Sequence, residues 1–266
     1  MRPLKHTLMG DGCRIAWRCD GPEGAPVLLL SNSLGTTLDM WAPQMEAFVR
    51  NFRVLRYDSR GHGASDVPAG AYSFDRLGRD VIELLDSLGI ARVHFCGLSK
   101  GGMVGQWLGF RAPERIGRLV LANTSPFMGP PPGWDQRIAT VHAQGMAAVA
   151  DGILDRWFTP SFQTRSKALV APFRAMLLAT NPHGYTGCCA AIRDMNMRPA
   201  LPSIDLPTLV IAGNADPATP LEHAHDLANN IPGAHLHILA AAHLSNVEEP
   251  QGFARAVLEW FEYADP

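Results

Sequence analysis

Hydrophobic residues in this sequence form two alternating patterns: short continuous apolar runs, and longer segments in which apolar positions recur every three or four residues. An apolar run bounded by turn residues is typical of a strand covered on both faces, and the longer spacing indicates a helix. Their alternation predicts an α/β fold with a mostly parallel central sheet flanked by helices. The predicted strands are 5–9, 14–19, 27–30, 53–57, 93–96, 118–122, 208–212 and 234–239.

Capping and turn residues set the limits of several predicted elements. The turn Gly10-Asp11-Gly12 predicts a hairpin between the first two strands. Ser73 can cap a helix whose apolar residues keep helical spacing to residue 88, and Gly89 can end it. The other predicted helices include 40–49, 104–110, 221–228 and 250–263.

The alternation of strand and helix stops between residues 125 and 199. This segment has helical patches, a proline-rich entry at 129–133 and several aromatic residues, and alternating units resume beyond it. We therefore expect a helical cap at 125–199, inserted into a core made of residues 1–124 and 200–266. Caps of this kind lie over an active site and select the substrate.

Length and charge narrow the range of partners. A chain of 266 residues can bury one large core, and its 23 Lys and Arg residues nearly balance 25 Asp and Glu, for a net charge of −2. Without a block of like charge, binding to nucleic acid or to a membrane surface has no electrostatic support. No apolar run reaches membrane-spanning length, and the N-terminal residues lack the hydrophobic core of a signal peptide, so we expect a cytoplasmic protein.

The five cysteines are an odd number, without the spacing of a metal site or a secretory context. We therefore expect them to be reduced, without a disulfide framework, and we expect no metal centre. Cys96 lies in the strand 93–96 and is expected to be a small buried hydrophobic residue.

The segment 93–102 predicts a nucleophilic serine. An apolar strand is followed by Gly97, Ser99 and Gly101 and then by a helical pattern, so Ser99 lies on a sharp turn between strand and helix. Glycines on both sides leave room for the crowded turn, which holds the Ser99 hydroxyl at the carboxyl edge of the sheet. The backbone N–H of Lys100, in the first turn of the helix, would face a developing oxyanion. A glycine-rich turn that only packs is the alternative.

A serine nucleophile needs a base and an acid that orients the base. In enzymes with such a strand–turn–helix the chain order is serine, acid, histidine, and ligands gather at the carboxyl ends of the strands. His243, on the loop after the last predicted strand, meets both conditions and is the predicted base. Asp216, which follows the strand 208–212, is the predicted acid. The alternatives are a turn role for Asp216 before Pro217, and Glu222 as the acid.

Two loops that precede the serine carry further candidates. The small-residue loop 31–37 follows the strand 27–30, and its Leu34 is the predicted second backbone donor to an oxyanion. A plain connection is the alternative for this loop. Asp58 and His62 lie in a turn rich in Gly, Asp and Ser, where such side chains usually satisfy backbone groups, so we interpret both as structural.

Several short motifs spread over nearly the whole chain can be compared with known families. They are Ser31-Asn32-Ser33-Leu34-Gly35-Thr36, Trp41-Ala42-Pro43-Gln44, the segment 53–58 with Arg60-Gly61-His62-Gly63, Phe95-Cys96-Gly97-Leu98-Ser99, Arg156-Trp157-Phe158-Thr159, and His243-Leu244-Ser245-Asn246 before Glu248. Together they resemble the 3-oxoadipate enol-lactonases of the α/β-hydrolase superfamily. The first motif is the most specific, because most relatives have a His-Gly type loop there. Lys100 departs from the family, in which Met is expected.

The resemblance implies hydrolysis of a small unsaturated lactone that carries a carboxylate. Ser99, activated by His243, would attack the lactone carbonyl, and the N–H groups of Leu34 and Lys100 would stabilise the oxyanion. Water would then release 3-oxoadipate from the acyl-enzyme. The reaction belongs to the bacterial degradation of aromatic compounds and requires no cofactor or metal. The expected partner is thus a small anionic lactone, and the choice between monomer and homo-oligomer stays open.

A substrate carboxylate in a partly apolar pocket needs a cationic partner. Trp134, Arg137 and Lys100 are the predicted substrate-binding residues, with hydrophobic packing as the alternative for Trp134 and a surface position for each cation. The remaining candidate cations in the cap are Arg156, Arg193 and Arg198. Other functions on the same scaffold are a carbon–carbon bond hydrolase, a carboxylesterase, a perhydrolase or a small-molecule receptor.

Overall fold

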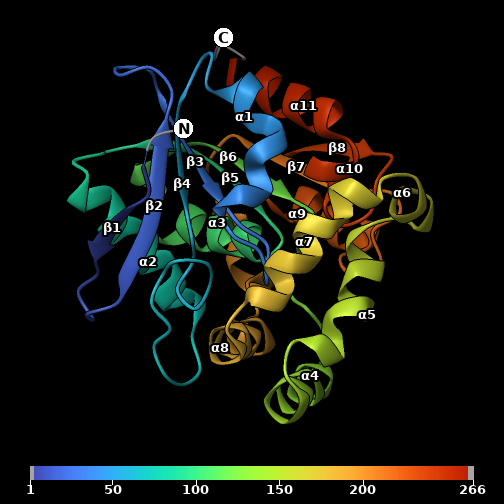
Figure 1. Ribbon diagram of the computed structural model, residues 1–266. Helices are drawn as coiled ribbons and strands as arrows, with labels where there is room; N and C mark the ends of the chain where they lie inside the picture. The colour runs from blue at the N-terminus through green and yellow to red at the C-terminus, as the bar shows by residue number, and fades with distance from the viewer. Residues whose placement is uncertain (1–2, 263–266) are drawn as a thin grey trace.

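The computed structural model describes residues 3–262 as an eight-stranded sheet with helices on both faces (Figure 1). The strand order is β1-β2-β4-β3-β5-β6-β7-β8, in which β1–β2 and β2–β4 are antiparallel and the other pairs are parallel. The predicted α/β fold with a mostly parallel sheet is therefore confirmed. The strands are β1 (Lys5–Leu8), β2 (Arg14–Asp20), β3 (Val27–Ser31), β4 (Arg53–Tyr57), β5 (Val93–Leu98), β6 (Ile116–Ala122), β7 (Thr208–Gly213) and β8 (His235–Leu239).

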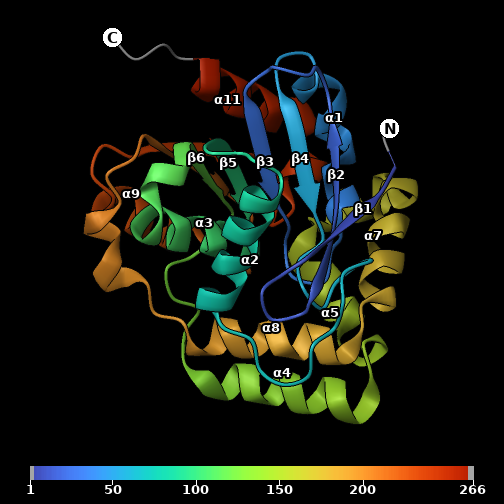
Figure 2. The same cartoon turned by 90° about the vertical axis from the view of Figure 1, so that its left-hand side faces the viewer.

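Helices on the two faces of the sheet come from different parts of the chain. Figure 2 shows α2, α3 and α9 on one side of the sheet, and α1 and α11 on the other. The bounds are α1 (Ala42–Phe48), α2 (Phe74–Ser87), α3 (Lys100–Arg111), α9 (Leu221–Asn230), α10 (Ser245–Glu248) and α11 (Pro250–Glu262), with short 3-10 helices at Leu38–Trp41, Pro113–Arg115 and Arg198–Ser203.

The described chain has five α-helices between β6 and β7, where the sequence predicts the cap. They are α4 (Pro131–Gln144), α5 (Ala147–Trp157), α6 (Pro160–Arg165), α7 (Lys167–Ala179) and α8 (Pro182–Asp194). The two views show α4 and α8 side by side, beyond the carboxyl ends of the central strands. These helices therefore cover the edge of the sheet at which the predicted catalytic residues follow their strands.

The predicted strand limits agree with the structure to within two residues. The predicted helix 40–49 is different, because Leu38–Trp41 forms a 3-10 helix and α1 begins only after it. Pro43 lies in the first turn of α1, where its fixed φ favours the start of a new helix. The last helix begins as predicted, but its predicted end at residue 263 lies outside the described residues.

Helix α3 is buried along almost its whole length between the sheet and α2. Small residues allow this close packing. A Cβ on Gly105 would lie 2.8 Å from the ring of Phe95, and a Cβ on Gly78 of α2 would lie 2.0 Å from the ring of Trp107. Because these contacts hold α3 between β5 and α2, the turn that joins β5 to α3 has a fixed position.

Three expectations from the sequence can be compared with the structure. All five cysteines are buried, and none is paired with another. Within residues 3–262, no helix combines the length and the apolar character needed to cross a membrane. The same residues hold no group of three or more His, Cys, Asp or Glu side chains placed to bind a metal ion.

Candidate active site

Ser99 lies on the turn between β5 and α3 with φ 57° and ψ −117°, a conformation that residues other than glycine rarely adopt. Its neighbours leave no space for side chains. A Cβ on Gly97 would lie 2.2 Å from the carbonyl oxygen of Gly101, and a Cβ on Gly101 would lie 2.1 Å from that of Ser31. The turn thus has the strained geometry expected of a nucleophile elbow, and Ser99 lines a cavity together with residues of α4, α5 and α8.

His243 and Asp216 are brought together at the same edge of the sheet. His243 Nδ1 lies 2.8 Å from Asp216 Oδ2, and both side chains are buried. Because the carboxylate accepts this hydrogen bond, Nδ1 carries the proton and Nε2 is left as the basic nitrogen. His243 lines the same cavity as Ser99. The structure therefore brings together the three residues predicted to form the triad.

Several donors hold the Asp216 carboxylate in place. Thr219 Oγ1 donates to Oδ2 at 2.7 Å, and the backbone N–H groups of Ala218 and Thr219 donate to Oδ1 at 2.8 and 3.0 Å. Burial raises the pKa of Asp216, but the neighbouring His243 and these donors outweigh burial, so the pKa lies below its usual range. Asp216 is therefore ionised at neutral pH and can support a positive charge on His243.

Asn123 was missed by the sequence analysis. It follows β6 with φ 43°, and its Nδ2 donates to Asp216 Oδ2 at 3.0 Å and to the carbonyl of Ala242 at 3.3 Å. Its Oδ1 accepts a hydrogen bond from Ser245 Oγ at 2.5 Å. Asn123 thus joins the acid to the loop that carries His243. Its position directly after a central strand was the available signal, because the other site residues also follow strands.

The two predicted backbone donors lie on different segments. Lys100 is the first residue of α3, so its N–H has no acceptor within the helix. Leu34 lies between two backbone amides whose hydrogen bonds are made. Ser33 N donates to Met40 Sδ at 3.3 Å, and Gly35 N donates to His62 Nε2 at 2.9 Å. No acceptor for the Leu34 N–H is found among residues 3–262. Both N–H groups are therefore available to a ligand beside Ser99.

A cavity between the sheet edge and the helices α4, α5 and α8 contains the predicted substrate-binding residues Trp134 and Arg137. Ser99, His243 and Leu34 form its base. The other residues that line it are Ser33, Met103, Met128, Ile153, Arg156, Trp157, Tyr185, Ile192 and Ala218. Most of these come from the segment in which helical patches could be recognised but the inward faces could not, so of these residues the sequence singled out only Arg156, as a candidate cation.

Arg137 and Arg156 both line this cavity, and no lining residue is acidic. The guanidinium of Arg137 lies 4.8 Å from the ring centroid of Trp134. Burial lowers the pKa of Arg156, and the charge of Arg137 lowers it further. Neither arginine forms an ion pair with the described part of the chain. The cavity therefore has an excess of positive charge above Ser99.

The other candidate cations are engaged elsewhere. Arg193 pairs with Asp135 and Asp194, at 2.8 and 2.7 Å. Arg198 lies over the ring of Phe127, 4.1 Å from its centroid. Neither arginine lines the cavity, so only Arg137 and Arg156 remain of the four arginines that the sequence analysis named between residues 125 and 199.

The Lys100 side chain also lies away from the cavity, contrary to the prediction that it binds substrate. It is fully buried, and its Nζ donates to Ser59 Oγ at 2.6 Å. Burial in the core lowers its pKa. The side chain and the backbone N–H leave the chain in different directions, so the N–H can serve an oxyanion while the ammonium group lies in the protein core.

Comparison with known proteins agrees with this geometry. A family model for the alpha/beta hydrolase fold matches residues 26–250, so the chain belongs to the α/β-hydrolase family. The chain is 42% identical to 3-oxoadipate enol-lactonase 2 of Acinetobacter baylyi over 254 residues, covering 96% of this chain and 95% of that protein. The resemblance to the enol-lactonase family is thereby confirmed, and the chain is a serine ester hydrolase.

Two further comparisons bear on its function. The crystal structure of the enol-lactonase from Burkholderia xenovorans LB400 has 41% sequence identity and a TM-score of 0.95, covering 97% of this chain and 99% of that one. A relative from Stutzerimonas stutzeri, named as a carbamate hydrolase, RutD, is 32% identical over 88% of this chain and 91% of its own length. The likeness to the enol-lactonases is therefore the stronger of the two.

The amide of Asn123 gives a prediction for pH-dependent stability. Asn123→Asp places a second carboxylate beside Asp216, and their repulsion should raise the pKa of Asp216. In the wild type, folding lowers the pKa of Asp216, so the ionised carboxylate stabilises the folded protein at pH values above the pKa that Asp216 has in the unfolded chain. This stabilisation is lost as the pH falls through the lower pKa of the folded protein. The variant should therefore lose more thermal stability at pH 7 than at pH 4, where one proton can be shared.

Asn123→Gly is the control, because glycine keeps the left-handed backbone and adds no charge. Melting curves of both variants between pH 4 and pH 8 provide the measurement. The glycine variant should show a loss that hardly changes with pH in this range. If the two variants show parallel losses at every pH, the amide of Asn123 does not control the charge of Asp216.

Proposed function

We propose that this enzyme opens a small enol-lactone that carries a carboxylate, with 3-oxoadipate enol-lactone as substrate and 3-oxoadipate as product, as part of the degradation of aromatic compounds. The observation that carries the proposal is the pair of arginines, Arg137 and Arg156, in a cavity that also contains Ser99. A buried carboxylate needs such partners, whereas a neutral ester does not. The names of the enol-lactonase relatives support the same substrate.

The first half of the reaction uses Ser99 as nucleophile. His243 Nε2 takes the hydroxyl proton while Ser99 Oγ bonds to the lactone carbonyl carbon, and the carbonyl oxygen becomes an oxyanion. The N–H groups of Leu34 and Lys100 donate hydrogen bonds to that oxyanion. Collapse of the tetrahedral intermediate breaks the bond to the ring oxygen, which leaves as an enolate. The enolate takes the proton held by His243 Nε2 and tautomerises to the ketone, so His243 is again a neutral base.

The second half uses water in place of the serine hydroxyl. His243 takes a proton from water as the oxygen attacks the acyl carbon, and the same two N–H groups stabilise the second oxyanion. The bond to Ser99 Oγ then breaks, and the proton returns to the serine. Asp216 stays ionised throughout and stabilises the imidazolium, which is consistent with its lowered pKa.

The cap binds the other end of the substrate in this proposal. Residues 125–199 form the cap, and Arg137 is oriented by the ring of Trp134 beneath its guanidinium. Arg156 adds a second positive charge on the same side. The carboxylate would thus be held at the cap while the lactone carbonyl lies over Ser99, which fixes the direction of the substrate in the cavity.

A comparison of substrates tests the proposal. The value of kcat/KM for 3-oxoadipate enol-lactone should exceed the values for p-nitrophenyl acetate, a small carbamate ester and a dienoate ring-fission product, each by about 100-fold or more. The aryl ester and the carbamate lack the carboxylate that the cap arginines would hold, and the dienoate has a carbon–carbon bond in place of the ester bond. Continuous absorbance assays measure all four. A much faster turnover of the aryl ester or of the carbamate would overturn the enol-lactonase proposal.

The three triad residues should act as one unit. Ser99→Ala and His243→Ala should each lower kcat by about 10,000-fold or more, while thermal unfolding stays close to that of the wild type. The double variant should lose no more activity than either single variant, because removing one member already disables the others. Single-turnover and steady-state rates of the three variants provide the measurement, and additive losses would contradict the proposed triad.

Arg137→Met should separate charge recognition from catalysis. Loss of a charge-assisted hydrogen bond is worth about 1.5–3 kcal/mol, so KM for the carboxylated lactone should rise about 10-fold or more. A neutral lactone of the same size should show almost no change. Arg193→Met is the matched control, since this arginine lies in the cap but outside the cavity. Equal increases for both lactones would show that Arg137 does not bind the carboxylate.

A further inference from the structure

The turn that follows β4 contacts both segments that carry the proposed oxyanion donors. We call residues 58–64 the β4–α2 turn. His62 Nε2 in this turn accepts a hydrogen bond from Gly35 N at 2.9 Å, next to the Leu34 donor. Lys100 Nζ donates to Ser59 Oγ of the same turn at 2.6 Å. One short segment thus connects two parts of the chain that are far apart in sequence.

His62 is suited to accept rather than donate at Nε2. The Gly35 N–H is a donor, so Nε2 carries no proton, and Nδ1 is left to donate to the carbonyl of Arg60 at 3.3 Å. The ring is 2% exposed. Burial lowers the pKa of His62 to about 3, with a further contribution from the charge of Lys100. The imidazole is therefore neutral throughout the range in which a serine hydrolase works.

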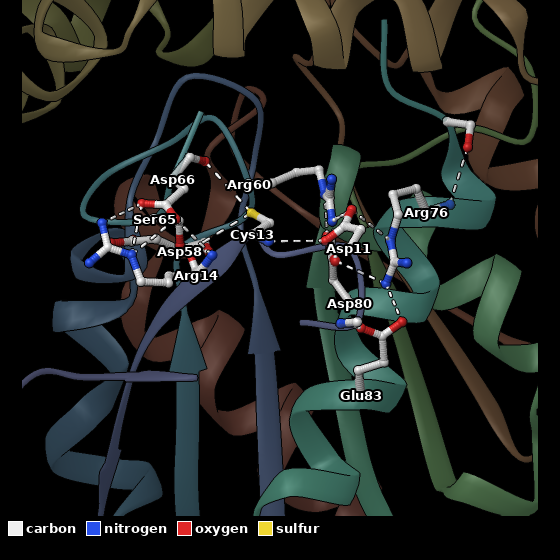
Figure 3. Close-up of polar contacts among 12 residues, drawn as sticks. Asp11, Cys13, Arg14, Asp58, Arg60, Ser65, Asp66, Arg76, Asp80 and Glu83 are labelled. Carbon is white, nitrogen blue, oxygen red and sulfur yellow. Dashed lines mark hydrogen bonds and ion pairs between the residues drawn. The ribbon is translucent and has the colours of Figure 1, made fainter. Parts of the chain in front are cut away.

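The β4–α2 turn is itself rigidly attached to the core. Arg60 forms two hydrogen bonds of 2.6 Å with the carboxylate of Asp80 on α2, and it also contacts Asp11 (Figure 3). On the other side, Asp58 accepts hydrogen bonds from the N–H groups of Leu38 and Ala64, at 2.7 and 2.9 Å. His62 is thus held between two anchored neighbours, so its acceptor nitrogen has little freedom to move.

Leu34 needs such an external anchor. Gly35 has φ 78° and adopts many backbone conformations at little cost, so the loop would rotate easily if its N–H groups had no partners. Met40 Sδ holds the N–H before Leu34, and His62 holds the N–H after it. The direction of the Leu34 N–H is fixed between these two points. A donor fixed before the reaction costs no reorganisation when the oxyanion forms.

We propose that His62 is a positioning residue for the oxyanion hole, which directs the Leu34 N–H by accepting the hydrogen bond of Gly35. The buried Lys100 side chain ties the segment of the second donor to the same turn. This inference rests on the proposed function, since it requires Leu34 to serve an oxyanion. It assigns a role in the reaction to a histidine that the sequence analysis interpreted as purely structural.

Two variants of His62 test this role. His62→Leu removes the acceptor, and His62→Gln keeps an acceptor oxygen near the position of Nε2. We expect His62→Leu to lower kcat by about 10- to 100-fold, because one oxyanion donor becomes misaligned. KM and the inhibition constant of 3-oxoadipate should stay within about threefold of the wild type. His62→Gln should restore kcat to within about fivefold.

A trifluoromethyl ketone reports on the oxyanion hole directly. Ser99 Oγ adds to its carbonyl carbon, the hydroxyl proton passes to His243, and the ketone oxygen becomes an oxyanion that the two backbone donors bind. His62→Leu should weaken this inhibitor by the same factor as kcat. Unchanged kcat and inhibitor affinity would overturn the inference. So would an equal loss of 3-oxoadipate affinity, which would indicate a general disturbance of the cavity.

A measurement on the wild-type protein covers the case in which His62→Leu does not fold. Nitrogen-15 spectra of labelled histidine should show His62 neutral at pH 5, with Nε2 unprotonated. A protonated Nε2, or titration of His62 near pH 6.5, would overturn the inference.

Both variants are also assayed with p-nitrophenyl acetate, whose hydrolysis needs the same oxyanion hole. If the wild type hydrolyses only this ester, the lactone proposal fails while the role of His62 is still decided.

Discussion

Helix α3 approaches the sheet so closely at the Ser99 turn that no side chain fits between them, and the arrangement of the site depends on this contact. Cβ atoms at Gly97, Gly101 and Gly102 would lie 2.2, 2.1 and 2.6 Å from neighbouring atoms. The close approach puts Ser99 into a left-handed conformation and aims the start of α3 at the cavity. A single residue thus presents a hydroxyl, while the next presents an N–H that has no acceptor within α3. The serine and one proposed oxyanion donor therefore have a fixed relative position before substrate binds.

The sequence predicted this part of the site because local pattern and chain order determine it. Strand, glycine, serine, glycine and helix follow one another within ten residues, and the required backbone conformation leaves few other interpretations. Asp216 and His243 could be selected because each directly follows a predicted strand, in the order that the fold demands. The parallel sheet converts these sequence positions into proximity, since the carboxyl ends of its strands meet at one edge.

The parts that sequence did not predict depend on contacts between distant segments. Asn123 reaches Asp216 from 93 residues away, and His62 reaches Gly35 from 27 residues away. No spacing rule identifies such pairs. Side-chain direction is a further property that the sequence did not predict. Lys100 follows Ser99 and was expected to lie close to the substrate, but the structure shows that its ammonium group lies in the core. Arg137 was among the predicted substrate-binding residues, but only coordinates show that Arg156 also lines the cavity and that Arg193 and Arg198 do not.

The charges around the cavity suit a reaction that creates an anion. On the proposed mechanism, hydrolysis adds a second carboxylate at the end of the molecule that lies over Ser99, whereas Arg137 and Arg156 hold the first. In that arrangement both lining cations are engaged by the first carboxylate, and ionised Asp216 lies behind His243. Like charges repel more strongly in a buried site than in water. The arrangement that neutralises the substrate at the cap therefore favours departure of the product from the catalytic end.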